Sequence, residues 1–84
     1  MKKAYLLIDV DTSAKAEQIA KLLRHKPAIS CADAVTGPHD VIAVVEGWDI
    51  AGQGLSALSD IREIEGVRYV TVCFAIRTEF GNGP

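Results

Sequence analysis

YLLI at residues 5–8 and VIAVV at residues 41–45 are the two most continuously apolar stretches of this 84-residue chain. Continuous runs of large and β-branched apolar residues are typical of strands that are buried on both faces. Such strands belong in the centre of a sheet rather than at its edge. The two stretches therefore predict two central strands, around which the other elements are placed.

The rest of the chain predicts two helices and two further strands. Residues 14–25 carry apolar side chains at helical spacing, with Ser13 as the expected N-cap and Pro27 as the stop. Residues 28–35 and 67–76 alternate as strands do, and residues 50–64 form a second helix capped by Asp49. The expected buried stripes are Ala16, Ile19, Ala20 and Leu23 in the first helix, and Ala51, Leu55, Leu58, Ile61 and Ile64 in the second.

The order of elements, βαββαβ, predicts an α+β ferredoxin-like sandwich. Two right-handed split crossovers give a four-stranded antiparallel sheet of order 4-1-3-2 with both helices on one face. This order places the two most apolar strands in the centre, as their composition requires. We expect one domain over residues 1–77 and a loose tail over residues 78–84, with Phe80 as a candidate anchor onto a neighbouring subunit.

The apolar content is high for so short a chain, since 49% of the residues are hydrophobic. A domain of this size buries only about 60% of the surface that its unfolded chain exposes. Neither face of the first strand is polar, because Leu6 and Ile8 lie on one face and Tyr5 and Leu7 on the other. A bare hydrophobic sheet face marks an interface. We therefore expect a homo-oligomer built on sheet-to-sheet dimers.

Charge, hydropathy and cysteine placement argue against several classes of function. The net charge is −2 without a basic stripe, so we expect no direct nucleic-acid binding. No signal peptide is visible and no apolar run approaches about 18 residues, so we expect a cytoplasmic protein without a membrane partner. Cys31 and Cys73 fall on opposite edge strands, roughly 14 Å apart, which excludes an intrachain disulfide. The cysteines and histidines lack metal-ligand spacing, so we expect no metal and no cofactor.

The candidate polar residues gather around the end of the first strand and the turn before the third. No nucleophile and base fall into a known catalytic arrangement, so we expect no enzyme and no catalytic residue. Asp9, Asp11, Asp33 and Asp40 cluster loosely there, in expected capping or turn roles. The turn VTGPHDVI at residues 35–42 has two interpretations. It is a tight hairpin that needs glycine and proline for its backbone, or a loop at a subunit junction that binds a small zwitterion.

The pattern VTG-x-HDVIAVV at residues 35–45, followed by Asp49, an amphipathic helix and Ile64-x-Gly66-Val67, resembles a known effector-binding domain. This is the RAM domain (regulation of amino acid metabolism), the C-terminal domain of the Lrp/AsnC or feast/famine transcription regulators. The resemblance covers essentially the whole chain. Its specific part is the pairing of the glycine-containing turn before the third strand with Gly66-Val67 before the fourth.

The resemblance implies a domain that dimerises through its sheets, assembles into rings of dimers and binds an amino acid or similar small metabolite between neighbouring dimers. The positions carried over as ligand-binding are Gly37, Pro38, His39, Asp40, Val70 and Val72. His39 stands where the family usually has Tyr or Phe, and the two valines stand where many members have Thr-x-Thr. Both departures alter the hydrogen bonding of the pocket.

The first strand begins at the third or fourth residue, which leaves no room for the N-terminal helix-turn-helix of the full-length regulators. We therefore expect the stand-alone form of the domain, with a full-length regulator of the same family as a candidate partner. Two alternatives share the topology. A dimeric α/β-barrel monooxygenase or isomerase would hold its substrate between sheet and helices within each protomer, and an ACT-type amino-acid domain would associate through side-by-side sheets.

Overall fold

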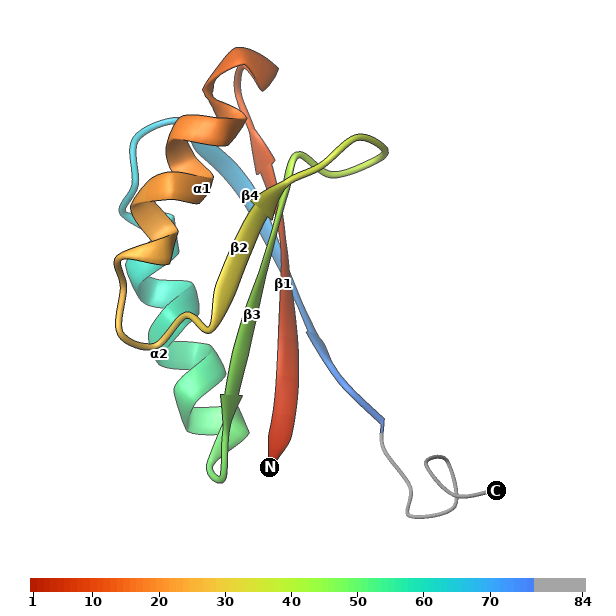
Figure 1. Ribbon diagram of the computed structural model, residues 1–84, viewed down its shortest axis with the longest axis vertical. Helices are drawn as coiled ribbons and strands as arrows, with labels where there is room; N and C mark the ends of the chain where they lie inside the picture. The colour runs from red at the N-terminus through yellow and green to blue at the C-terminus, as the bar shows by residue number, and fades with distance from the viewer. Residues whose placement is uncertain (77–84) are drawn as a thin grey trace.

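A computed structural model, which describes residues 1–76, shows a four-stranded sheet with two helices packed on one of its faces (Figure 1). The elements are β1 (Lys2–Val10), a short 3-10 helix η1 (Ser13–Lys15), α1 (Ala16–Arg24), β2 (Cys31–Ala34), β3 (Val41–Gly47), α2 (Ile50–Arg62) and β4 (Val67–Phe74). All strand pairs are antiparallel and the sheet order is β2-β3-β1-β4. The predicted ferredoxin-like fold is confirmed. The predicted tail and Phe80 lie outside the described residues.

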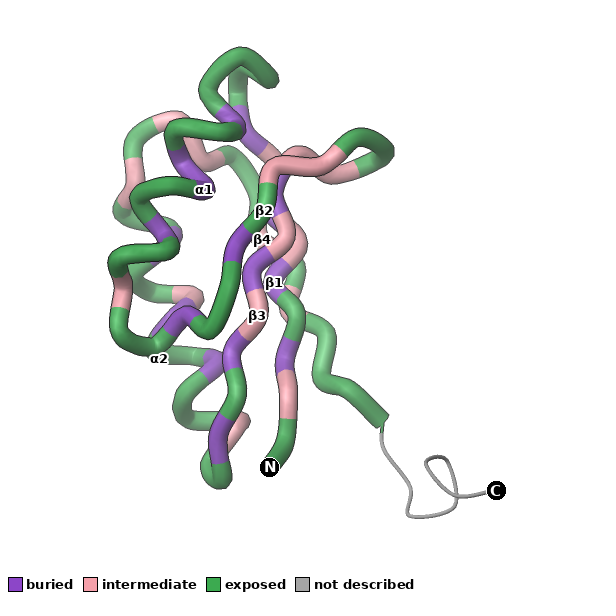
Figure 2. Tube along the Cα trace, viewed as in Figure 1, coloured by how far each residue is buried: buried purple, intermediate pink, exposed green. Residues whose placement is uncertain are grey.

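The hydrophobic core fills the layer between the helices and the sheet. Ala4, Leu6 and Ile8 of β1 are completely buried there, and β3 alternates between buried and half-buried residues over most of its length (Figure 2). This period of two is that of a strand with one covered face. Both apolar stretches thus lie in the centre of the sheet, as the sequence predicts.

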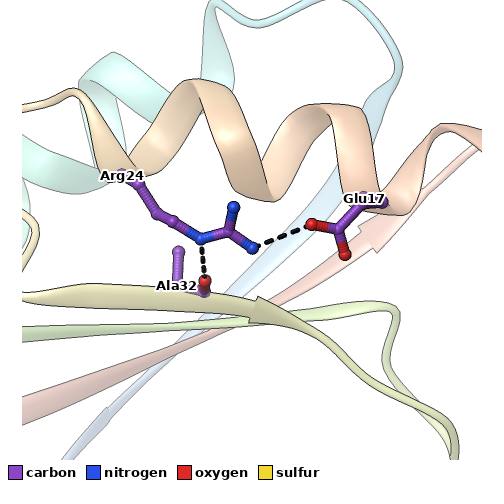
Figure 3. Close-up of polar contacts among 3 residues, drawn as sticks. All are labelled: Glu17, Arg24 and Ala32. Carbon is purple, nitrogen blue, oxygen red and sulfur yellow. Dashed lines mark hydrogen bonds and ion pairs between the residues drawn. The ribbon is translucent and has the colours of Figure 1, made fainter.

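Helix α1 carries its buried stripe as predicted, with Ala16, Ile19, Ala20 and Leu23 facing the sheet. Its last turn is tied to the edge strand β2 by Arg24, whose Nε donates to the Ala32 carbonyl oxygen at 2.9 Å (Figure 3). The same guanidinium lies 2.9 Å from Glu17 Oε1. Arg24 therefore links helix and strand through a charge-assisted hydrogen bond.

Several element ends differ from the prediction. The first helix starts with a 3-10 turn, and Ser13 belongs to that turn instead of capping the helix. β2 is shorter than predicted because Ile29 N–H donates to the Lys26 carbonyl in a turn, and the chain joins β3 only from the Ser30 N–H bond to the Val44 carbonyl onward. Asp49 does cap α2, accepting from Gly52 N–H at 3.4 Å.

The buried side of α2 was predicted wrongly in its first turns. Leu55 is 64% exposed, whereas Gly54 and Ala57 face the sheet. A Cβ atom at Gly54 would lie 3.4 Å from the Phe74 ring and 4.0 Å from the Ala4 Cβ. The helix approaches the sheet closely at this end, so only small residues fit between them.

The other face of the sheet, which we call the open face, has no helix over it (Figure 1). In the strand register, Tyr5 of β1 pairs with Val44 of β3, and Leu7 pairs with Ile42. These four side chains form the apolar centre of the open face. Each pair belongs to a row of side chains that crosses the sheet. The row of Tyr5 and Val44 ends at Cys31 on β2 and Cys73 on β4, and the row of Leu7 and Ile42 ends at Asp33 on β2 and Thr71 on β4. Among residues 1–76, no helix is long and apolar enough to cross a membrane.

Candidate functional site

The turn between β2 and β3 projects beyond the sheet on the side away from the helices (Figure 1). Val35 N–H donates to the Asp40 carbonyl at 2.8 Å and closes the turn. Gly37 has a φ of +117°, a backbone conformation that favours glycine. A Cβ atom placed there would have no other atom within 4 Å, so the requirement for glycine comes from the backbone and not from the surrounding residues. Gly37 and Pro38 are exposed, and His39 and Asp40 are half-buried. The backbone interpretation of Gly37 is thus correct.

Asp40 anchors this turn to the end of β1. Its backbone N–H donates to the Ile8 carbonyl at 2.9 Å, and its Oδ2 accepts from Val10 N–H at 2.9 Å. The β1–β4 register shifts between Asp9 and Val10, so the pairing is irregular at this point. The Asp40 carboxylate therefore bonds the backbone of β1 at the irregularity and leaves one oxygen for other contacts.

His39 is held by Asp9, which the sequence places near the turn in an expected capping or turn role and not as a partner of the imidazole. Its Nδ1 lies 2.8 Å from Oδ1 of Asp9, and the two side chains are 29% and 32% exposed. Asp9 lies on β1, opposite Tyr69 of β4 and on the open face. The sequence did contain a signal for this contact, because β1 and β3 are neighbours in the predicted sheet and His39 lies shortly before β3.

The structure brings four of the six predicted ligand-binding residues together and separates the other two. Val70 pairs with Ile8 and Val72 with Leu6, so both valines lie on the helix side of the sheet, packed against the core. The turn with His39 and Asp9 lies on the opposite side. On the open face β4 presents Tyr69, Thr71 and Cys73 instead. Val70 and Val72, which were carried over from the resemblance, therefore do not share a face of the sheet with the turn, since neighbouring residues of a strand point to opposite faces.

Two cavities lie elsewhere on the described chain. One of about 400 Å³ opens between the first turn of α2 and the adjoining ends of β1 and β4, lined by Lys2, Ile50, Ala51, Phe74 and Ala75. The second, of about 180 Å³, lies beside α1 and is lined by Lys15, Gln18, Ile19, Leu22 and Glu65. Neither includes the turn.

Clustered metal ligands and bonded cysteines are both absent among residues 1–76. No group of three or more potential ligands there could hold a metal ion. Cys31 and Cys73 are free and exposed on opposite edge strands, as the predicted topology requires.

The fold is shared with solved structures of transcription regulators, although no protein-family model and no curated sequence matches the chain. TTHA0845 from Thermus thermophilus is 24% identical with a TM-score of 0.78, over 93% of this chain and 96% of that one. A transcriptional regulator from Neisseria meningitidis, NMB0573, in complex with L-methionine is 18% identical with a TM-score of 0.73, over 93% of this chain and 51% of that one.

The feast or famine regulatory protein Rv3291c from M. tuberculosis, complexed with L-methionine, is 17% identical with a TM-score of 0.72, over 100% of this chain and 56% of that one. The chain thus spans about half the length of the two regulators and nearly all of the Thermus protein. These similarities show that the chain has the same ferredoxin-like fold as these proteins.

Proposed function

We propose that the chain is a non-enzymatic sensing domain of the Lrp/AsnC type, a cytoplasmic homo-oligomer that binds an amino acid or similar small metabolite. The observation that carries this proposal is the fold shared with two regulators whose solved structures contain L-methionine. Their likeness extends over at least 93% of this chain. The sequence pattern of the turn and of Gly66-Val67 points to the same family. Its role would be to modulate transcription regulation of amino-acid metabolism, with full-length regulators as partners.

Dimerisation would use the open face. Tyr5 is 37% exposed, and Leu7, Ile42 and Val44 remain half-buried although no helix covers them. A second sheet packed about 10 Å away would remove these side chains from water. Burial of apolar area is the dominant favourable term in such association. The open face is therefore the proposed dimer interface.

The ligand would bind at the turn formed by Gly37, Pro38, His39 and Asp40, where a neighbouring dimer completes the pocket. An α-amino acid needs an acceptor for its ammonium group and donors for its carboxylate. The second oxygen of Asp40 and the His39 imidazole can accept from the ammonium group, and the exposed turn offers backbone N–H groups to the carboxylate. Val70 and Val72 are left out of this site because they pack against the core.

Isothermal titration calorimetry against the twenty amino acids, beginning with L-methionine, tests the proposal. We expect saturable heat with at least one of them and weaker binding in His39→Ala. His25→Ala is the matched control, because His25 is the other histidine, is exposed, and lies at the far end of α1. If none of the twenty gives heat above dilution at millimolar concentration, the amino-acid part of the proposal is refuted.

An enzyme is the second candidate, and the cavity of about 400 Å³ between α2 and the sheet is the observation that favours it. Its lining offers Lys2 as a single ionisable side chain, which supplies no acid–base pair. Ala51→Phe would fill this cavity without touching the turn. Binding of the amino acid unchanged in Ala51→Phe supports the site at the turn, and lost binding in a folded variant supports the cavity.

A further inference from the structure

Asp9 and Asp40 both hold the turn, although 30 residues separate each of them from its partner along the chain. Asp40 bonds to backbone groups of β1, at Ile8 and Val10. Asp9 bonds to the imidazole of His39. The Asp40 carboxylate thus holds the main chain of β1 against the turn, and the Asp9 carboxylate contacts the His39 side chain.

The contact with Asp9 also determines which ring nitrogen of His39 carries the proton. A deprotonated carboxylate only accepts hydrogen bonds, so Nδ1 must donate. In the neutral ring the proton then sits on Nδ1, and Nε2 carries a lone pair that points away from Asp9. Within residues 1–76 the ring makes no other hydrogen bond. Nε2 is therefore an oriented acceptor without a protein partner in the described chain.

We propose that Asp9 is a positioning residue that orients His39 and fixes its Nδ1–H tautomer, so that Nε2 accepts a hydrogen bond from the ammonium group of the ligand. The orientation of His39 rests on the 2.8 Å contact between its Nδ1 and Asp9 Oδ1 alone. The hydrogen bond to the ligand rests also on the proposed function. Asp9 lies on the open face, at the end of the strand that carries Tyr5 and Leu7. A dimer formed through that face would shield the Asp9–His39 contact from water and strengthen it.

Nitrogen NMR of the imidazoles tests the orientation without any ligand. In ¹⁵N-labelled protein at a pH where histidine is neutral, protonated and unprotonated ring nitrogens have well-separated shifts. We expect the Nδ1–H tautomer for His39 in the wild type, and a shift toward the Nε2–H tautomer in Asp9→Ala. Exposed His25 is the internal reference. Asp11→Ala is the matched control, since the Asp11 side chain makes no hydrogen bond in the described chain.

Wild-type His39 in the Nε2–H form would overturn the inference, and so would an unchanged tautomer in folded Asp9→Ala. Both outcomes are independent of amino-acid binding. An aspartate that supported the fold without bonding to His39 would leave the tautomer unchanged.

A double-mutant cycle measured by calorimetry with L-methionine tests the link to the ligand. Asp9→Ala and His39→Phe should each weaken L-methionine binding by about three- to tenfold, which corresponds to the loss of one hydrogen bond. The double variant should bind L-methionine no more weakly than His39→Phe alone. Additive losses would show that Asp9 acts independently of His39 and would overturn its positioning role. If wild-type protein binds none of the twenty amino acids, the proposed function fails while the NMR result still decides whether Asp9 orients His39.

Discussion

Cys31 and Cys73 lie at opposite ends of one row of side chains that crosses the open face. Cys31 pairs with Val44 on β3, Val44 pairs with Tyr5 on β1, and Tyr5 pairs with Cys73 on β4. Both thiols are free and exposed in the single chain. The row therefore carries a natural chemical probe at each edge of the proposed dimer interface.

Thiol reactivity should report the dimer. A face-to-face dimer covers the row, so both cysteines should react with a maleimide at least about tenfold more slowly than in unfolded protein. Stopped-flow or mass-spectrometric labelling at micromolar concentration measures these rates. Ile42→Lys places a charge in the apolar centre of the open face and should restore fast labelling, whereas Leu22→Lys on the exposed side of α1 should not.

The same labelling separates the two modes of association. Side-by-side sheets of the ACT type leave the open face in water. Fast labelling of both cysteines in a protein that is dimeric by mass would therefore contradict the face-to-face arrangement.

Arg24→Met should lower the free energy of unfolding by about 1 kcal/mol, because it removes the hydrogen bond to the Ala32 carbonyl. The ion pair with Glu17 adds little, since the Arg24 and Glu17 side chains are 41% and 71% exposed. Urea denaturation at fixed protein concentration measures the loss. Lys21→Met, in the same last turn of α1, is the control and should change stability by less than about 0.5 kcal/mol. Equal losses in both variants would show that the Arg24 contact is not stabilising.

Gly37→Ala should cost about 1–2 kcal/mol of folding stability through backbone strain alone. The φ of +117° disfavours a residue with a Cβ, and open space around the position removes any steric contribution. Thr36→Ala at the neighbouring position should be close to neutral. A neutral Gly37→Ala in urea denaturation would mean that the turn adopts a different conformation.

Leu6→Ala should lower the free energy of unfolding by about 2–5 kcal/mol, because Leu6 is completely buried in the centre of β1. Thermal or urea denaturation followed by circular dichroism measures the effect. Leu22→Ala removes the same atoms from a side chain that is 48% exposed and should cost less than about 0.5 kcal/mol. Similar losses at the two positions would contradict the assignment of the core face.

The sheet order could be predicted because it depends on composition averaged over whole strands. Residues 5–8 and 41–45 are apolar throughout, and only the central positions of the sheet need such strands. The stripe of α1 was equally clear, since its four buried residues repeat at helical spacing. The stripe of α2 was not, because the helix meets the sheet through Gly54 and Ala57 and leaves the larger Leu55 in water. Hydrophobicity alone points to the wrong residues where the packing distance is short.

The candidate site depends on register, which composition does not reveal. The sequence identified Gly37, His39 and Asp40 as a unit, and the structure places them together in one turn. It assigned Val70 and Val72 to that unit, although both lie on the helix side of β4. It also left Asp9 as one of several turn aspartates, because the contact with His39 depends on the alignment of two segments 30 residues apart. A one-residue error in that alignment moves a side chain to the other face.

Light scattering coupled to gel filtration, at micromolar concentration, tests the central claim most directly. If the open face is the interface of an oligomeric sensing domain, the mass should be at least twice the 9.0 kDa of the chain, and Ile42→Lys should reduce it to that of one chain. A wild-type protein that elutes as a single 9.0 kDa species would contradict the account, because the apolar centre of the open face would then be stable in water without a partner.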